Sequence, residues 1–308
     1  MSRRANQIGI KPTVSIIGAG RLGTALALAL ASNGYSVEAV VARRLSHAQK
    51  ARKGLGGGLA LSETQLSELP ASTLLLIATP DDVISSVARR LAKSQKEKPR
   101  NRTVLHTSGA LSSEVLKPLR DAGFHTGSLH PLISVSDSRS GAADLRASFY
   151  CLEGDHGAMR LARRIVRDLG GRSFAIDTCQ KALYHAAAVM ASGHMVALFD
   201  LATEMLARCG LREANARKVL LPLVESTVRN LSSSAPARAL TGTFARGDLN
   251  TVRKHLDALS SEGQKDALAV YRLLGKRSLK LLEERGADTA LLKQIQKILD
   301  ESHKTGHN

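Results

Sequence analysis

The sequence predicts two domains: a doubly wound, mainly parallel α/β sheet followed by an all-helical domain. Short β-branched strand patterns alternate with amphipathic helical patterns as far as Asp177, and only helical patterns follow it. The chain has 308 residues, a length that suits about two domains. A glycine-rich motif at residues 18–23 joins the first strand pattern to the first helical pattern, which is typical of doubly wound folds.

Each domain is built from elements that we expect in a fixed order. Strands are expected at residues 13–17, 36–42, 73–78, 103–106, 125–129, 149–153 and 173–176. Helices are expected between them at residues 22–32, 45–53, 81–92, 113–122 and 156–169. The second domain is expected to hold helices at residues 178–209, 212–231, 248–259, 263–284 and 288–301. We therefore place the domains at residues 12–177 and 178–301, with disordered tails at 1–11 and 302–308.

The glycine motif lies in the strand–turn–helix context that a dinucleotide site requires. Residues 14–23 read Val-Ser-Ile-Ile-Gly-Ala-Gly-Arg-Leu-Gly, a G-x-G-x-x-G motif after a β-branched run. Gly18 would make the tight turn, Gly20 would admit a pyrophosphate, and Gly23 would let the helix pack closely on the strand. The amides and dipole of the helix would then face the phosphates. The expected cofactor contacts of this Rossmann motif are Gly18, Ala19, Gly20, Arg21, Leu22 and Gly23.

The end of the second strand pattern favours NADP over NAD. An NAD site uses an acidic residue there to bind the ribose, whereas an NADP site uses basic residues. Arg43 and Arg44 follow this strand and can supply planar donors to a 2′-phosphate, with the hydroxyl of Ser46 beside them. Glu38 lies at about the nominal spacing of the acidic residue, but early in the strand rather than at its end. The alternative is that both arginines are surface charge in a basic protein.

Thr79 and Pro80 follow the third expected strand and should flank the cofactor. Ligands of doubly wound sheets bind at the carboxyl ends of the strands, where these two residues lie. Asp81 and Asp82 come next, and we expect these acids to cap the following helix.

Polar residues after the next two strands are candidates for catalysis. Ser108 follows the strand at 103–106, and His130 follows the strand at 125–129. Hydride transfer to a carbonyl or imine needs a proton donor near the acceptor atom, and His is the usual donor at neutral pH. A structural hydrogen bond is the alternative role for each of these side chains.

Lys181 and His185 lie four residues apart at the start of the helical domain, and so on one helix face. Lys181 could bind a substrate carboxylate or donate a proton, and His185 could orient the substrate. The alternative is that both are helix-surface residues. Arg246, in the polar turn at residues 241–248, could face an anionic substrate, whereas Asp248 is expected to cap the next helix.

The charge and composition indicate anionic partners without favouring nucleic acid. The formal net charge is +17, but aromatic residues make up 3% of the chain and Trp is absent. Few rings are therefore available to stack on bases. A basic surface with an anionic cofactor is the simpler interpretation.

Cysteines and hydropathy suggest a cytoplasmic protein. Cys151, Cys179 and Cys209 are scattered, show no metal-ligand spacing and fit a reducing compartment. The N-terminal residues lack the apolar core of a signal peptide. Residues 183–206 are apolar but are interrupted by polar side chains, so we expect a buried helix, wrapped either by other helices or by a second subunit.

Five segments together resemble a known family: G-A-G-R-L-G, H-T-S-G-A-L, S-L-H-P-L, Y-H-A-A-A and L-T-G-x-x-A-R-G-D. The chain resembles, over residues 12–300, the uncharacterised Rossmann-like oxidoreductases with a helical C-terminal domain of unknown function. These resemble the 6-phosphogluconate dehydrogenase superfamily, which includes prephenate dehydrogenase, pyrroline-5-carboxylate reductase, ketopantoate reductase and deazaflavin-dependent NADP reductases.

The resemblance implies a homodimer through the helical domain and a substrate cleft between the domains. Ser108 and His130 match the Ser and the His-Pro motif that flank substrate in prephenate dehydrogenases. Lys181 matches the catalytic Lys of hydroxyacid dehydrogenases and ketopantoate reductases, with His185 where those enzymes have Asn. Gly193 and Thr243 stand where the closer family is expected to have Asn and Pro.

The sequence thus predicts an NADP-dependent oxidoreductase that transfers hydride between NADPH and a small anionic carbonyl or imine compound. Ser108, His130, Lys181 and His185 are its expected catalytic residues. The alternative is an NADP-binding sensor without turnover, which the change to Gly193 motivates.

Overall fold

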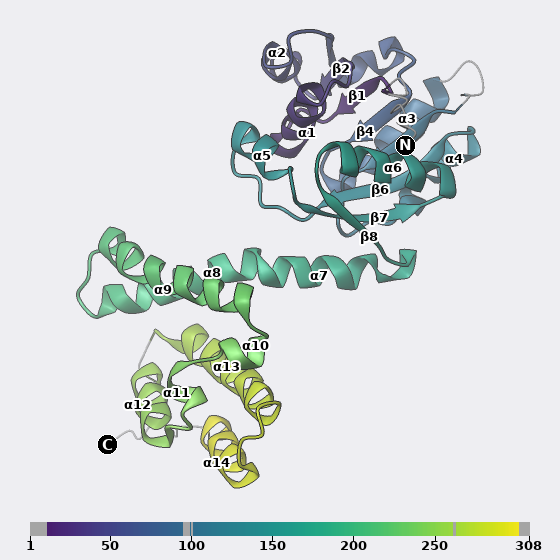
Figure 1. Ribbon diagram of the computed structural model, residues 1–308. Coiled ribbons are helices and arrows are strands. Elements are labelled where there is room, and N and C mark those ends of the chain that lie inside the picture. The colour runs from purple at the N-terminus through teal and green to yellow at the C-terminus, as the bar shows by residue number, and fades with distance from the viewer. Residues whose placement is uncertain (1–10, 95–98, 100, 261–262, 302–308) are drawn as a thin grey trace, which may run out of the picture. The chain divides into compact units, whose positions relative to one another are not determined.

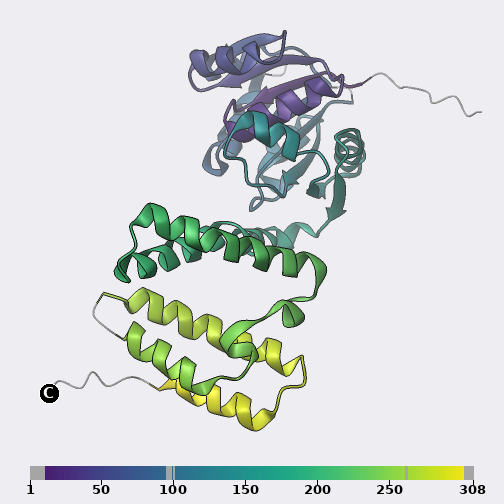
Figure 2. The same ribbon diagram turned by 60° about the vertical axis from the view of Figure 1, so that its left-hand side comes forward.

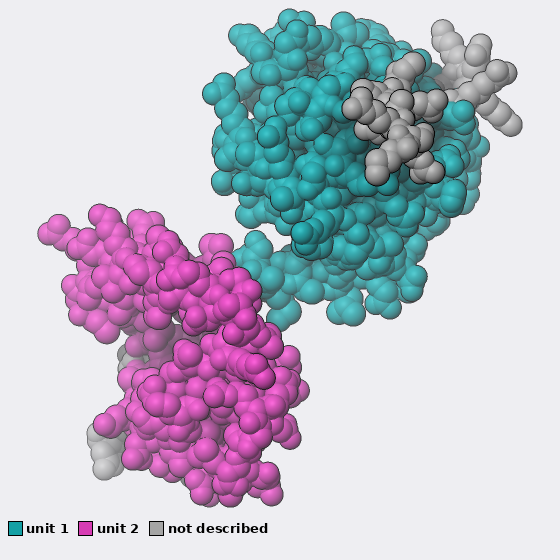
Figure 3. Space-filling model, viewed as in Figure 1, with its two compact units in different colours: residues 1–194 teal, residues 195–308 magenta. Residues whose placement is uncertain are grey.

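The computed structural model describes residues 11–94, 99, 101–260 and 263–301 (Figure 1). The chain divides into two compact units, unit 1 at Met1–His194 and unit 2 at Met195–Asn308 (Figure 3). The tails expected at 1–11 and 302–308 lie outside the described residues, apart from Lys11.

Unit 1 holds an eight-stranded sheet in the order β3-β2-β1-β4-β5-β6-β7-β8. The strands are β1 (Val14–Ile17), β2 (Val37–Ala42), β3 (Leu59–Ser62), β4 (Leu74–Ile77), β5 (Thr103–His106), β6 (His125–Pro131), β7 (Phe149–Gly154) and β8 (Arg172–Ala175). All neighbouring strands pair in parallel except β6 and β7, which are antiparallel. The mainly parallel sheet predicted from the sequence is confirmed, and β3 is an additional strand that the sequence did not reveal.

Helices cover both faces of this sheet (Figure 1). They are α1 (Arg21–Ser32), α2 (Leu45–Lys53), α3 (Asp81–Ser94), α4 (Lys117–Asp121), α5 (Ser138–Asp144) and α6 (His156–Asp168), with short 3₁₀ turns η1 (Glu63–Glu68), η2 (Ser113–Leu116) and η3 (Thr178–Gln180). Alternate strand residues enter two cores: Ile16 packs with α1, α2 and α6, whereas Ile17 packs with α3 and α4. This period of two is what a doubly wound sheet requires.

The parallel pairing determines where the functional side chains meet. β1, β4, β5 and β6 run in one direction as neighbours in the sheet. Their carboxyl ends therefore lie along one edge of the sheet. The glycine motif, Thr79, Ser108 and His130 all lie at or just beyond this edge.

The described residues of unit 2 form helices and connecting turns (Figure 2). The helices are α8 (Gly193–Arg208), which begins two residues before the boundary, α9 (Glu213–Ser233), α10 (Pro236–Ala239), α11 (Gly242–Ala245), α12 (Leu249–Leu259), α13 (Lys265–Glu283) and α14 (Thr289–Asp300). Side chains of α12, α13 and α14, among them Leu256, Leu282 and Ile298, form the core. Asp248 caps α12 as expected, accepting a hydrogen bond from the Thr251 amide at 3.0 Å.

The single long helix expected at residues 178–209 is interrupted. α7 (Lys181–Ala191) ends where Ser192 leaves helical geometry, at φ −120° and ψ −74°, and α8 begins at Gly193. Ser192 is a poor helix former and Gly193 a poorer one, so a break there costs little.

The expectation that this segment is buried is also wrong for the chain by itself. Leu183 is 70% exposed, Met190 68% and Val196 65%. The segment Thr178–Arg208 is long and apolar enough to cross a membrane when judged by length and composition alone. Its apolar side chains are not covered by the described part of this chain.

Candidate functional site

The glycine motif has the geometry that a close approach to phosphate needs. Gly18 has φ +113°, and a Cβ there would lie 2.5 Å from the carbonyl oxygen of Ala78. A Cβ on Gly23 would lie 1.9 Å from the carbonyl oxygen of Gly18, so only glycine lets α1 pack this closely. By contrast, a Cβ on Gly20 would meet nothing within 4 Å. The structure therefore leaves open space at Gly20, the position at the N-terminus of α1.

A basic hollow of about 820 Å³ lies beside this motif. Its lining joins Ala19, Gly20 and Arg21 to side chains of α2 and of the N-terminus of α5. The basic members of that lining are Arg21, His47, Lys50, Lys53 and Arg139. Sequence reasoning missed the last four. The spacing of 47, 50 and 53 along one face of α2 was the available signal.

Arg43 and Arg44 lie where the sequence placed them, between β2 and α2, and both are exposed together with Ser46. Arg44 is the extended residue that precedes α2. Glu38 lies near the opposite end of β2 and accepts a hydrogen bond from the hydroxyl of Ser72 at 2.5 Å. Its carboxylate is therefore engaged away from the carboxyl edge, in agreement with its exclusion as a ribose ligand.

Thr79 and Pro80 follow β4 at the carboxyl edge. Pro80 is exposed, whereas the buried hydroxyl oxygen of Thr79 has no hydrogen-bond partner among the described residues. An unpartnered buried hydroxyl costs free energy unless a ligand or water satisfies it. Asp81, expected as a cap, lies in the first turn of α3 and accepts a hydrogen bond from the Ser108 hydroxyl at 2.8 Å.

Ser108 and Lys181 are brought together, but behind the open part of the site. The Ser108 hydroxyl also accepts from the backbone amides of Ala110 and Leu111, at 3.1 and 2.9 Å. Lys181 is 2% exposed, and its Nζ donates to the Ser108 carbonyl at 3.0 Å and to the Ser128 hydroxyl at 2.9 Å. Burial lowers the pKa of Lys181. Both side chains therefore connect α7 and α3 to the ends of β5 and β6.

His130 and His185 lie together at the open part of the site. Their ring centroids are 5.7 Å apart in a T-shaped arrangement. Burial, assisted by the charge of Lys181 and then of His185, lowers the pKa of His130 to about 4. His130 is therefore neutral at pH 7. Its Nδ1 is 2.6 Å from the hydroxyl oxygen of Tyr184, a residue that sequence reasoning missed.

Gly109 lets the two histidine rings pack closely against its backbone. A Cβ on Gly109 would lie 2.4 Å from His185 Nδ1 and 2.8 Å from His130 Nε2, too close for either contact. His185 Nδ1 is buried and has no hydrogen-bond partner in the described part of the chain. Glycine at this position therefore brings two ring nitrogens together, and one of them is an unpartnered buried atom that a ligand or water would satisfy.

A hollow of about 330 Å³ adjoins these rings within unit 1. Besides His130 and His185 it is lined mainly by apolar or small residues: Pro131, Leu132, Ile133, Ser134, Ala188, Val189, Ala191, Ser192 and Gly193. It suits a small molecule with an apolar body and one polar head that reaches the two histidines.

A buried histidine next to this site, His106, was noticed in the sequence only as the end of its strand. Burial, with the charge of Lys181 second, lowers its pKa to about 3. Its Nδ1 accepts a hydrogen bond from the Ser108 amide at 3.2 Å. His106 therefore helps to shape the turn that carries Ser108 and Gly109.

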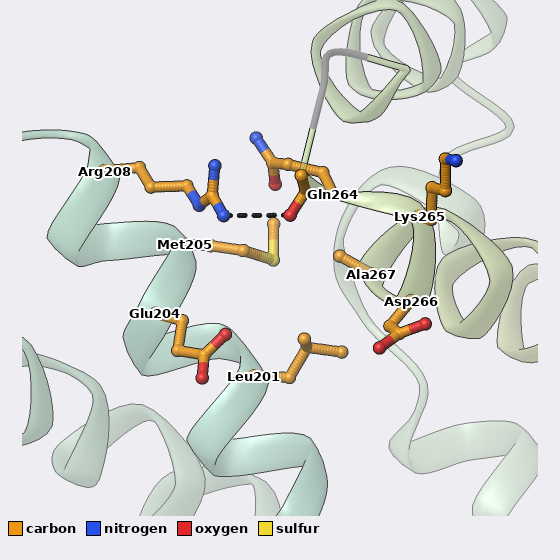
Figure 4. A pocket seen from close by; sticks show the side chains of 9 residues that line it. Leu201, Glu204, Met205, Arg208, Gln264, Lys265, Asp266 and Ala267 are labelled. Carbon is orange, nitrogen blue, oxygen red and sulfur yellow. Dashed lines mark hydrogen bonds between the residues drawn. The ribbon is translucent and has the colours of Figure 1, made fainter.

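Unit 2 has a hollow of its own, of about 740 Å³, between α8 and the start of α13 (Figure 4). Glu204 and Arg208 of α8 face Asp266 and Gly263 across it, and Arg208 donates to the carbonyl of Gly263 at 2.8 Å. None of the residues expected in the site lies in the described lining. Arg246 is exposed after α11, and its role toward a substrate stays a prediction.

Two family models match different parts of the chain. A family described as a Rossmann-like domain matches residues 3–131, and one described as a domain of unknown function, DUF2520, matches residues 148–278. A search of curated proteins found no match.

Solved structures share the fold. A Bacteroides fragilis protein, provisionally assigned as an NADP oxidoreductase, is 24% identical over 87% of this chain and 98% of its own, with a TM-score of 0.70. A reductive aminase from Aspergillus terreus in complex with NADPH is 14% identical over 94% of this chain and 93% of its own, with a TM-score of 0.55. A pyrroline-5-carboxylate reductase from Coxiella burnetii is 16% identical over 94% of this chain and 99% of its own, also at 0.55. At these identities the likeness establishes the fold. The chain therefore combines a Rossmann-like domain with a DUF2520 domain, the family organisation that its sequence motifs predicted.

Proposed function

We propose that this protein is an NADP-dependent oxidoreductase that transfers hydride between NADPH and a small anionic carbonyl or imine compound. The observation that carries the proposal is the pair of histidines, His130 and His185, that line one hollow and pack against Gly109, with His185 Nδ1 buried and unpartnered among the described residues. His130 and Gly109 lie at the same edge of the sheet as the glycine motif. Doubly wound sheets bind their ligands at that edge.

The chain's own residues fit NADP. The open space at Gly20 suits a pyrophosphate at the N-terminus of α1. Arg43, Arg44 and Ser46 would bind the 2′-phosphate, and the basic hollow beside them adds positive charge. Ala19, Arg21 and Leu22 would line the turn, and Thr79 and Pro80 would flank the bound cofactor. The unpartnered hydroxyl of Thr79 would then gain a partner.

The proposed reaction needs a hydride and a proton. Bound NADPH supplies a hydride, and its two electrons, to the acceptor carbon. The π bond of the carbonyl or imine breaks, and its oxygen or nitrogen takes one proton. We assign the contacts to this heteroatom to His130 and His185. Neutral His130 donates a hydrogen bond from Nε2 to the developing negative charge, and the heteroatom takes its proton from solvent. Lys181 and Ser108 would hold the strand ends in place through their mutual hydrogen bond, with Lys181 as the second candidate for the proton donor.

Cofactor binding can be tested by thermal unfolding with and without NADPH. A ligand at a hundred times its dissociation constant should add about 2.7 kcal/mol to the free energy of unfolding. We expect NADPH to stabilise more than NADH does, and the Arg43→Ala/Arg44→Ala variant to lose this preference. Lys93→Ala, on the far end of α3, is the matched control. No stabilisation by either nucleotide would overturn the proposal.

Turnover separates this proposal from the sensor alternative. A screen of keto and imino acids should identify a compound that oxidises NADPH, followed by absorbance. Tight NADPH binding without oxidation by any of them would favour a sensor that keeps the cofactor site.

We also propose that a second copy of this chain covers the exposed apolar side chains of α7–α9, and that the dimer is cytoplasmic. The exposed residues include Leu183, Val196 and Val219. His194, Asp200 and Glu204 interrupt the apolar run of α8, which disfavours a lipid environment and suits a protein partner.

Light scattering tests the dimer. The wild type should be dimeric and Val196→Asp should weaken the dimer, whereas Leu59→Asp, an exposed leucine on β3, should not. A monomeric wild type would contradict the proposal, and a monomer that sediments with lipid vesicles would assign the surface to a membrane.

A further inference from the structure

Tyr184 contacts His130 from the side opposite to the proposed substrate. Its hydroxyl oxygen lies 2.6 Å from His130 Nδ1, and the rings are T-shaped with centroids 5.6 Å apart. The other ring nitrogen, Nε2, lies close to Gly109, as does His185 Nδ1. The position of the hydrogen between His130 Nδ1 and the Tyr184 oxygen therefore determines whether Nε2 carries a hydrogen and donates, or carries none and accepts.

Both groups in this contact are neutral at pH 7. Burial raises the pKa of the Tyr184 hydroxyl and lowers the pKa of His130 to about 4. Each group therefore carries one hydrogen. The hydrogen between them lies either on the Tyr184 oxygen or on His130 Nδ1.

The chemistry of the two groups favours the first arrangement. A phenolic hydroxyl donates well and an imidazole nitrogen accepts strongly, whereas sulfur accepts weakly. With the hydrogen on the Tyr184 oxygen, the hydroxyl donates to His130 Nδ1. With the hydrogen on Nδ1, the phenolic donor would find at best the weakly accepting sulfur of Cys151. The single ring hydrogen of neutral His130 then lies on Nε2.

We infer that Tyr184 fixes His130 in the Nε2–H tautomer, so that a neutral imidazole donates a hydrogen bond to an acceptor heteroatom bound in the hollow that His130 and His185 line. Tyr184 is a positioning residue in this arrangement, because it acts through His130. The inference rests on the proposed function for the identity of the acceptor, while the tautomer is a property of the protein alone.

The tautomer also selects the substrate. A hydrogen on Nε2 needs an acceptor with a free lone pair, such as a carbonyl oxygen. A protonated imine has no lone pair on nitrogen and would place its N–H against the Nε2–H. The neighbouring charge of Lys181, which acts on His130, disfavours a cationic substrate as well. We therefore assign the site to a ketone or aldehyde in preference to a cationic iminium compound.

Nitrogen NMR of histidine-labelled protein tests the tautomer directly. His130 is assigned by comparison with His130→Gln. In the wild type at pH 7 we expect an unprotonated, acceptor-type shift for Nδ1 and a protonated, pyrrole-type shift for Nε2. In Tyr184→Phe we expect the two tautomers to mix, with intermediate shifts at both nitrogens.

The chain offers a matched control. Tyr271→Phe removes the hydroxyl that lies 2.8 Å from His255 Nδ1 in unit 2, and it should leave the His130 signals unchanged. A wild-type His130 that carries its hydrogen on Nδ1 would overturn the inference, as would an unchanged tautomer in folded Tyr184→Phe. If Tyr184→Phe does not fold, the wild-type spectrum decides alone.

Substrate preference gives the second readout. Tyr184→Phe should keep its NADPH affinity within about twofold and lose about tenfold or more in kcat with a keto substrate, since the donor is no longer oriented. Absence of NADPH binding by the wild type would defeat the proposed function and leave the tautomer result standing. A faster reaction with a permanently charged iminium than with a ketone would overturn the substrate assignment.

Discussion

Each unit of this protein places a tyrosine hydroxyl against a histidine ring, and the two pairs have nearly the same local geometry. Tyr184 and His130 in unit 1 are 2.6 Å apart, with ring planes at 85°. Tyr271 and His255 in unit 2 are 2.8 Å apart, with ring planes at 87°. The first pair is partly buried, whereas His255 is exposed on α12.

The surroundings of the two pairs differ in the features that a ligand site needs. Only His130 is accompanied, among the described residues, by a second histidine and by a glycine against which both rings pack. Burial and the charge of Lys181 keep His130 neutral. The comparison teaches that a tyrosine–histidine hydrogen bond does not define a site by itself. The features that indicate a site are burial, unpartnered polar atoms and a position at the carboxyl edge of a sheet.

Removing each imidazole should give the largest difference between the two pairs. His130→Ala should lower kcat by about 10²–10³-fold, the usual loss when one hydrogen-bond donor to a developing negative charge is removed. His255→Ala, a surface change, should stay within about twofold of the wild type. Steady-state kinetics with the substrate found in the screen measures both. Equal losses from the two variants would show that the buried pair has no special role.

Adding a side chain at Gly109 should have the next largest effect on turnover. The methyl group of Gly109→Ala must displace His130 and His185, because its Cβ would lie within 2.8 Å of a nitrogen of each ring. We expect about a 10²-fold loss of kcat/KM with NADPH binding retained. The control is Gly193→Ala in the same hollow, where the nearest atom would be 3.8 Å from the new Cβ. An active Gly109→Ala would mean that the reacting atom binds elsewhere.

The smallest expected effect is on stability at acidic pH. The pKa values of His130 and His106 are lowered to about 4 and about 3 in the folded protein, from about 6.5 in the unfolded chain. Their contribution to stability is therefore complete above about pH 6.5 and is lost as the pH falls toward 4 and then 3. Each group changes the free energy of unfolding by at most about 1.4 kcal/mol per pH unit.

Urea unfolding between pH 7 and pH 4 checks this prediction. His130→Gln should flatten the dependence of the unfolding free energy on pH, and His255→Gln should not. A wild-type stability that stays constant from pH 6.5 to 4 would contradict the assignment of a neutral, buried His130.

The sequence predicted the strand–turn–helix of the glycine motif because that part of the fold is local. The strand, the turn at Gly18–Gly23 and α1 are contiguous, and Arg43 follows the very next strand. The antiparallel pairing of β7 could not be predicted, because strand direction depends on neighbours far along the chain. The short strand β3 follows a glycine-rich segment and has too few residues to show a period.

The catalytic half was predicted less completely because it is assembled from separate segments. Gly109, His130 and Tyr184 come from the ends of β5 and β6 and from α7. Their residue types gave no sign that the glycine would lie between two imidazoles. Lys181 was expected to reach the substrate, yet the fold engages it with the Ser108 carbonyl and the Ser128 hydroxyl. Its exact role in turnover stays a prediction.

Addition of NADP⁺ to histidine-labelled protein tests the central claim most directly. If the cofactor places its nicotinamide at the carboxyl edge of the sheet, the nitrogen signals of His130 and His185 should shift on saturation, while the signal of His255 should stay unchanged. Saturable binding that leaves His130 and His185 unmoved, or that shifts His255 equally, would contradict the account.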